Sequence, residues 1–349
     1  MSEKEIITND KTTGKEVEEK YDIILIGTEI EHVNYLGSRT FHLKNILQKY
    51  LPEIKIGLYD VLAEDDDRIK LKANNYIFLP WIESIDLNWS NFFITMEGLG
   101  KKILYTDDFY WYQEQKERLL SDGFNLENLF DTVALSSREH SGWWNSRTYR
   151  YWGAGIYNEF YEKIDIKKIL EEKDKDKKIL FIDSPWSLEM SQEPYNAMRV
   201  FDECIPKLKD KYSNLKIVSQ NCDKKWVDEN LPERLDFNEM LKHYQAADVY
   251  VVSHKETAGL GQFDSRLCGV KNVTTKEFSN HSSLLAGEYT HELWSLEEGN
   301  QSFIDAVSKC LEDYDHEEIK QLSLQAFNDE IFFKNMVKDL WEVEYKKES

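Results

Sequence analysis

The segment Ser253-His-Lys-Glu256-Thr-Ala-Gly259-Leu-Gly-Gln-Phe-Asp264-Ser-Arg-Leu-Cys-Gly269 directly follows the apolar run Asp248-Val-Tyr-Val-Val252. Short apolar runs rich in β-branched residues are typical of buried parallel strands. In open α/β sheets, ligands bind beyond the carboxyl ends of such strands. The sequence therefore predicts a strand that ends in a glycine-bearing turn, with Glu256 and the glycines facing a cleft.

Two acids of this segment are spaced to meet one ligand. Glu256 lies in the turn, and Asp264 follows eight positions later, about two helical turns further on. Carboxylates accept hydrogen bonds from the vicinal hydroxyls of sugars, and a glycine-bearing helix start can bring backbone amides to a phosphate. The alternative is a surface loop with incidental acids, since the chain has 65 Asp and Glu. The joint pattern, with the short strand of residues 271–275 after it, favours a functional site.

Predicted strands alternate with predicted helices from Tyr21 onward, which indicates stacked βα units and parallel sheets. Apolar runs predict strands at residues 21–27, 54–59, 76–79, 102–105 and 132–135 in the first half, and at 177–182, 215–218, 248–252 and 271–275 in the second. Helical spacing predicts helices at residues 38–50, 194–211, 237–247, 303–314 and 319–347.

The segment resembles the nucleotide-sugar signature of retaining GT-B glycosyltransferases of the group 1, or family 4, type. The shared order is Ser253, Glu256, Gly259-Leu260, Asp264 and Cys268-Gly269. Three further segments resemble parts of that family in the correct order: the loop entering the first helix at residues 37–41, the interdomain segment at 151–160, and the helix before the signature strand at 237–248.

The resemblance implies an α/β fold of the GT-B type. Two Rossmann-like doubly wound domains would face each other across a cleft, and a C-terminal helix would cross back to the first domain. The corresponding boundaries are a disordered tail at 1–20, an acceptor domain at 21–160, a charged linker at 161–176, a nucleotide-sugar domain at 177–320 and the returning helix at 321–349.

The resemblance also implies roles for individual residues. Glu256 is expected to be the catalytic acid beside the donor sugar, and Asp264 the acid that binds ribose. The amides of residues Ala258, Gly259 and Leu260 are expected to stabilise the leaving diphosphate, as helix amides do in metal-independent enzymes. Ser253, Lys255 and Arg266 complete the expected donor-binding set.

One departure from the family pattern concerns the donor diphosphate. The family carries an Arg and a Lys just after the first strand of the second domain, but residues 183–193 contain no basic residue. A diphosphate needs compensation by cations or helix amides. Lys255 and Arg266 are the nearest substitutes, and Arg147, Arg150 and Arg199 are others; an ordinary surface role fits Arg266 equally well.

The acceptor side is expected on the first domain. Asp107, Asp108 and Trp111 follow a predicted strand end, and Gly37 lies in the loop that enters the first helix. Aromatic rings stack on sugars and acids accept their hydroxyl hydrogens, so these residues fit an acceptor subsite. An acidic helix cap followed by core aromatics explains Asp107 and Asp108 at least as well.

Composition limits the possible partners. The 349 residues suffice for two domains, and a formal charge of −21 opposes extended contact with nucleic acid or anionic lipid. Four cysteines without metal-binding spacing indicate free thiols, and neither a signal peptide nor a membrane span is present, so we expect a cytoplasmic protein without a metal or other cofactor.

The leading hypothesis is a retaining transferase that moves a hexose from a nucleotide-sugar to a glycan, lipid-linked or small-molecule hydroxyl. The alternatives are a catalytically silent GT-B subunit, which the missing bases at residues 183–193 suggest, and a sugar transferase that acts on modified nucleic acid. The donor sugar, the nucleotide base, the acceptor, the acceptor base and the oligomeric state are left open.

Overall fold

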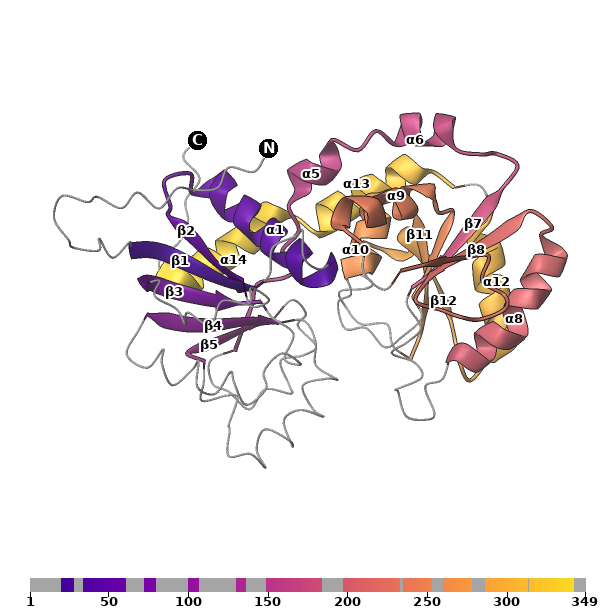
Figure 1. The fold of residues 1–349 in the computed structure, drawn as a ribbon, viewed down its shortest axis with the longest axis horizontal. Helices are drawn as coiled ribbons and strands as arrows, with labels where there is room; N and C mark the ends of the chain where they lie inside the picture. The colour runs from indigo at the N-terminus through magenta and orange to yellow at the C-terminus, as the bar shows by residue number, and fades with distance from the viewer. Residues whose placement is uncertain are drawn as a thin grey trace, which may run out of the picture.

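Two parallel β-sheets of six strands each form the centres of two lobes, which Figure 1 shows side by side. The structure, a computed structural model, describes residues 20–27, 34–60, 72–79, 100–106, 130–135, 149–183, 197–232, 235–252, 260–277, 286–312 and 314–341. All strand pairs in both sheets are parallel. This is the predicted fold class: an α/β protein with two Rossmann-like domains.

The first sheet has the order β2-β1-β3-β4-β5-β6. The inner strand β1 is apolar and inaccessible to solvent. Its residues Ile23, Ile24, Leu25 and Ile26 are fully buried on both faces, as expected for a parallel sheet covered by helices. The strands are β1 (Lys20–Gly27), β2 (Ile56–Asp60), β3 (Lys72–Phe78), β4 (Lys101–Thr106), β5 (Thr132–Leu135) and β6 (Tyr149–Tyr151), with helix α1 (Asn34–Tyr50) between β1 and β2.

The second sheet has the order β12-β11-β10-β7-β8-β9. Its strands are β7 (Lys178–Ile182), β8 (Leu215–Gln220), β9 (Glu229–Leu231), β10 (Val249–Val251), β11 (Lys271–Thr275) and β12 (His291–Trp294). Its helices are α8 (Ala197–Lys211), α9 (Phe237–Ala246), α10 (Leu260–Leu267) and α12 (Asn300–Cys310), with a 3₁₀ turn, η3 (Glu288–Thr290), before β12.

The strand order of the second sheet reverses between β7 and β10. The chain leaves β7 toward β8 on one side and leaves β10 toward β11 on the other. Such a reversal leaves a crevice at the carboxyl ends of the two central strands, where doubly wound proteins bind their ligands. The signature segment leaves the sheet at this point, because it follows β10.

The chain passes between the lobes through α5 (Asn158–Glu162) and α6 (Ile166–Glu172). Residues 161–176, which the charged composition predicts to be a linker, include helix α6. Its N-cap is Asp165, whose side chain accepts a hydrogen bond of 3.1 Å from the Lys168 amide. A good N-cap stabilises a short helix by about 1 kcal/mol, which charge patterning does not reveal.

The last part of the chain forms two helices, α13 (His316–Ala326) and α14 (Asp329–Trp341). The prediction of one helix over residues 319–347 is wrong on this point. The helix is interrupted because Phe327 leaves the helical conformation and the Asn328 side chain accepts a hydrogen bond of 3.0 Å from the Ile331 amide, which starts a new helix.

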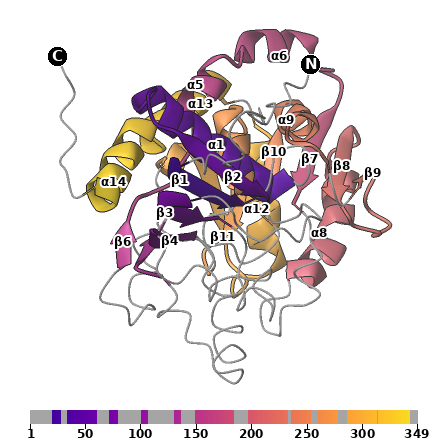
Figure 2. The same cartoon turned by 60° about the vertical axis from the view of Figure 1, so that its left-hand side comes forward.

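Helix α14 returns to the first lobe, as expected for this fold, and Figure 2 shows it beside that lobe. Phe332, Phe333 and Met336 are buried in the same cluster as the β1 and α1 side chains. At one end of α14, Asp329 accepts from Lys49 Nζ at 2.9 Å and Tyr50 Oη at 2.7 Å. At the other end, Asp339 accepts from Trp152 Nε1 at 2.8 Å.

We expect Gly155→Ala to destabilise the protein. An added Cβ would lie 2.8 Å from Cζ of Phe332, a ring that is only 1% exposed and has no space to move. Overpacking of this kind costs about 1–3 kcal/mol, which urea denaturation measures. In a Phe332→Leu background the same substitution should cost much less; an equal cost in both backgrounds would contradict the proposed clash.

Candidate functional site

Helix α10 carries the second acid of the signature, and its glycines fix its position. A Cβ on Gly261 would lie 3.0 Å from Tyr244 Oη and even closer to Tyr250 Oη, so only glycine lets the first turn pack this tightly against α9 and β10. At the other end, Gly269 has φ of +78°, and the Val270 amide donates to the Ser265 carbonyl at 2.9 Å. This left-handed helix end explains the glycine of the small pair.

A buried polar network joins α10 to β11. The Gln262 carbonyl accepts hydrogen bonds from Asn272 Nδ2 at 3.0 Å and from Arg266 Nε at 2.9 Å. Ser265 Oγ donates to Asn272 Oδ1 at 3.0 Å. Buried networks of this kind allow a single arrangement, so the helix and its acid are held in one register on the sheet.

Asp264 is buried in the interior, with 4% of its surface exposed. The Tyr161 hydroxyl, which comes from α5 between the lobes, donates a short hydrogen bond to Asp264 Oδ1. Burial raises the pKa of Asp264 to about 7, and the Tyr161 hydrogen bond opposes that rise because it favours the carboxylate. The carboxyl therefore changes its charge within the neutral pH range.

His42 of α1 extends this contact into the first lobe. Its Nε2 lies 3.5 Å from Tyr161 Oη, and its Nδ1 accepts a hydrogen bond of 3.3 Å from the Tyr157 amide. Complete burial lowers the pKa of His42 to about 3, so the ring is neutral at physiological pH. Because Nδ1 accepts from an amide, the single ring proton is on Nε2 and points at the tyrosine oxygen.

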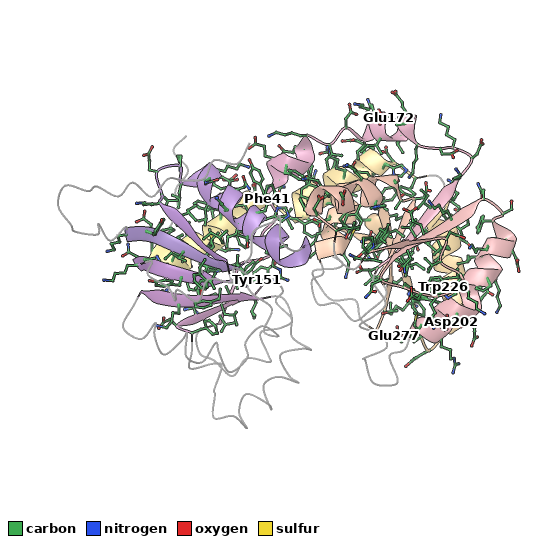
Figure 3. The ribbon with its side chains drawn as sticks, viewed as in Figure 1. Phe41, Tyr151, Glu172, Asp202, Trp226 and Glu277 are labelled. Carbon is green, nitrogen blue, oxygen red and sulfur yellow. The ribbon has the colours of Figure 1, made fainter. Side chains whose placement is uncertain are left out.

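An aromatic cluster surrounds these polar groups where the two lobes meet. We call Phe41, His42, Phe160, Tyr161 and Phe237 the interlobe aromatic cluster. Phe41 contacts Phe160 and Phe237 with centroid distances of 5.4 Å and 5.8 Å, and Figure 3 labels Phe41 on α1 at the side facing the second lobe. The members come from α1, α5 and α9, so the cluster joins both lobes and the connecting segment.

Four of the residues predicted for the site lie in described helices. Gly37 lies near the start of α1, Leu260 is the first residue of α10, and Asp264 and Arg266 follow in α10. The other predicted site residues lie outside the described residues: Glu256, Ser253, Lys255, Ala258, Gly259, Asp107, Asp108 and Trp111.

Arg266 is fully buried. Its guanidinium carbon lies 5.2 Å from the Phe327 ring centroid and 5.8 Å from that of Phe263, and burial lowers its pKa to about 9. Its Nε bonds back to the Gln262 carbonyl at 2.9 Å. These contacts favour a packing role at the α10–α13 junction. Of the other basic candidates, Arg150 pairs with Asp339 at 3.2 Å, and Arg199 pairs with Glu203 at 3.5 Å on an exposed helix face.

Sequence reasoning missed His42 and Tyr161. The predicted interdomain segment ended at Phe160, one position before the tyrosine that contacts Asp264. The sequence does contain a pattern that points to these two residues: the adjacent pairs Phe41-His42 and Phe160-Tyr161. Each pairs a purely apolar ring with a ring that carries a polar atom, as expected where an apolar interface also has to satisfy a polar group.

The described residues contain neither a candidate metal site nor a candidate membrane span. Within the described ranges, no group of three or more His, Cys, Asp or Glu could hold a metal ion. Across the same part of the chain, no helix is both long and apolar enough to cross a membrane. All four cysteines are buried free thiols.

Comparison with known proteins identifies the fold. No known family profile matches the sequence, and no curated protein matches it. Among solved structures, HepE of Anabaena in complex with UDP and glucose is similar with a TM-score of 0.61 and 13% identity, covering 93% of this chain and 100% of its own. Sucrose-phosphate synthase of Thermosynechococcus elongatus has a TM-score of 0.58 at 11% identity, covering 92% and 96%.

A third similar structure is an alpha-glucosyltransferase in complex with UDP and a 13-mer DNA containing an HMU base. Its TM-score is 0.58 at 11% identity, and the match covers 92% of this chain and all of that one. These matches span both lobes of the chain. The protein therefore has the two-domain GT-B fold of nucleotide-sugar glycosyltransferases.

We expect Asp264→Asn to stabilise the protein above neutral pH. The pKa of Asp264 in the folded protein, about 7, exceeds the ordinary 3.8. Ionisation of the buried carboxyl therefore lowers the free energy of unfolding progressively between about pH 4 and pH 7, and by a constant amount above pH 7. Asn keeps the shape and can accept from Tyr161. At pH 8 the variant should be more stable by roughly 2–4 kcal/mol in urea denaturation. A difference from wild type that does not vary between pH 4 and 8 would contradict this account.

Proposed function

We propose that the protein transfers a sugar from a nucleotide-sugar donor to an acceptor hydroxyl. The observation that carries the proposal is the position of Asp264, on the helix that follows the switch-point strand β10 of a GT-B fold. Ligands of doubly wound sheets bind at this edge, and the similar HepE and alpha-glucosyltransferase structures contain UDP.

The donor would be bound chiefly by the second lobe. Asp264 is proposed to accept the ribose hydroxyls and Glu256 to contact the donor sugar as the catalytic acid. Ser253 and Lys255 and the amides at the start of α10 are proposed to bind the diphosphate without a metal ion. Because Arg266 packs against Phe327 and bonds to the Gln262 carbonyl, we assign diphosphate binding to Lys255 and these amides instead.

The acceptor would meet the donor from the first lobe. We keep Gly37, Asp107, Asp108 and Trp111 as the acceptor-side residues, because they follow carboxyl ends of strands in the first sheet or enter its first helix. We further propose retention of the anomeric configuration and transfer of a hexose, on the resemblance of the signature alone. The free cysteines are consistent with a reducing compartment such as the cytoplasm.

A nucleic-acid acceptor is the second candidate, because similar alpha-glucosyltransferase structures contain DNA. The formal charge of −21 works against it, since phosphate contacts need clustered Lys and Arg. We therefore propose a glycan, lipid-linked or small-molecule acceptor.

Nucleotide binding tests the proposal directly. We expect uridine or guanosine diphosphate, at one hundred times its dissociation constant, to stabilise the protein by about 2.7 kcal/mol in a thermal-shift experiment, because ligand binding to the folded state adds to its stability. The corresponding nucleoside monophosphate is the control for the diphosphate contribution. A protein stabilised by no nucleotide would be the silent subunit rather than an enzyme.

Glu256→Gln tests the catalytic assignment. The amide keeps the shape of the side chain but not its charge, so turnover should fall by roughly a hundredfold or more while the melting temperature is retained. Glu288→Gln, at an exposed residue of η3, is the matched control and should leave turnover unchanged. Wild-type turnover in the Glu256 variant would remove this residue from the site.

A further inference from the structure

Three side chains from three parts of the chain form one line of polar contacts. His42 belongs to α1 of the first lobe, Tyr161 to α5 between the lobes, and Asp264 to α10 of the second lobe. We propose that Tyr161 is a positioning residue that orients the donor acid Asp264, and that His42 of the first lobe directs the tyrosine hydroxyl toward it. This inference rests on the proposed function, because it assumes that Asp264 accepts the donor ribose.

The direction of the hydrogen bonds follows from the donors present. The Tyr157 amide occupies His42 Nδ1 at 3.3 Å, so the proton of the neutral ring is on Nε2. His42 Nε2 lies 3.5 Å from Tyr161 Oη, longer than an ordinary N–H···O hydrogen bond, so this is a weak polar contact. With an N–H approaching its oxygen, the tyrosine directs its own proton away, onto Asp264 Oδ1.

Tyr161 is held firmly enough to orient another group. Lys320 of α13 donates to the Ile164 carbonyl at 2.6 Å, just beyond the C-terminal end of α5. Asn158, the first residue of α5, donates through Nδ2 to the Leu324 carbonyl at 2.8 Å. Both ends of this short helix are therefore fixed to α13, and Tyr161 itself is fully buried between them.

The hydrogen bond leaves Asp264 able to bind a ligand. An ionised carboxylate has two oxygens and about four acceptor positions, of which Tyr161 uses one on Oδ1. The rest can accept from two vicinal ribose hydroxyls once the tyrosine has fixed the carboxylate plane. A pre-oriented acceptor loses less entropy on binding than a mobile one, so its positioning contributes to affinity.

The same contact favours the charged form that ribose requires. Burial raises the pKa of Asp264 to about 7, and the hydrogen bond from Tyr161 lowers it. Among the described residues, other titratable groups around this pair are His42, Tyr244 of α9, Cys268 just after α10 and Lys320 of α13. Burial keeps His42 neutral and raises the pKa of Cys268 well above its ordinary value. Asp264 is thus the group expected to titrate near pH 7.

The affinity for uridine diphosphate between pH 5.5 and 9 tests the inference by calorimetry. In wild type the affinity should increase with pH around pH 7, as Asp264 ionises. Tyr161→Phe removes only the hydroxyl, so this midpoint should move up by about one pH unit and the dissociation constant at pH 7 should rise about fivefold. Asp264→Asn should lose this midpoint, because its side chain does not ionise. The pH dependence that remains in this variant comes from the nucleotide phosphate and is subtracted from the wild-type profile.

Two further variants complete the design. Tyr76→Phe is the matched control, because Tyr76 is also fully buried but its hydroxyl accepts from the Ala73 amide in the first lobe. It should leave the midpoint in place. His42→Phe should move the midpoint upward by less than Tyr161→Phe, and it carries the test if the Tyr161 variant does not fold.

The outcomes separate the two proposals. If wild type and Tyr76→Phe bind the nucleotide but Tyr161→Phe keeps the wild-type midpoint, Tyr161 only fills space and the inference is wrong while the proposed function stands. If the Tyr161 variant does not fold, an unmoved midpoint in His42→Phe overturns the inference in the same way. If wild type binds no nucleotide at all, the proposed function falls and the inference falls with it.

Discussion

A carboxyl group in a protein interior must be hydrogen-bonded, because moving a charge out of water is costly. Asp264 imposes this constraint at the junction of the two lobes, and its hydrogen bond from Tyr161 meets it. Much of the surrounding structure is needed to make that contact. Helix α10 can approach closely because residue 261 is glycine, and α5 is fixed at both ends to α13. Under the proposed function, the donor ribose is the ligand that this acid binds.

The lobes are connected by more than a linker. Asp329 joins α14 to Lys49 and Tyr50 of α1, and its Oδ2 also accepts from the Asn158 amide at 3.3 Å. The interlobe aromatic cluster lies beside this polar anchor and contributes apolar area. An apolar contact can slide, whereas hydrogen bonds require one geometry. The polar contacts therefore fix α14 and the start of α5 on α1, and the aromatic rings join α1 to α5 and α9.

The sheets were predictable from sequence, because buried parallel strands such as those within residues 21–27 and 248–252 are mostly apolar and β-branched runs. The short strands β6, β9 and β12 were not found, since their pairing depends on neighbours that are distant in sequence. The signature located α10 and Asp264, but no local pattern shows that Tyr161 meets Asp264 across 103 positions. The break at Asn328 depended on one side-chain cap within an otherwise helical pattern.

The return of α14 to the first lobe has a consequence for biosynthesis. Phe332, Phe333 and Met336 are fully or almost fully buried against strands that are made roughly two to three hundred residues earlier. While the ribosome is still translating, the first lobe therefore lacks one wall of its core and exposes apolar surface. Domains usually fold one after another as they emerge. Here the second lobe can complete its own sheet before the first lobe is finished, so the N-terminal half is expected to reach its final structure last and to need protection from aggregation until then.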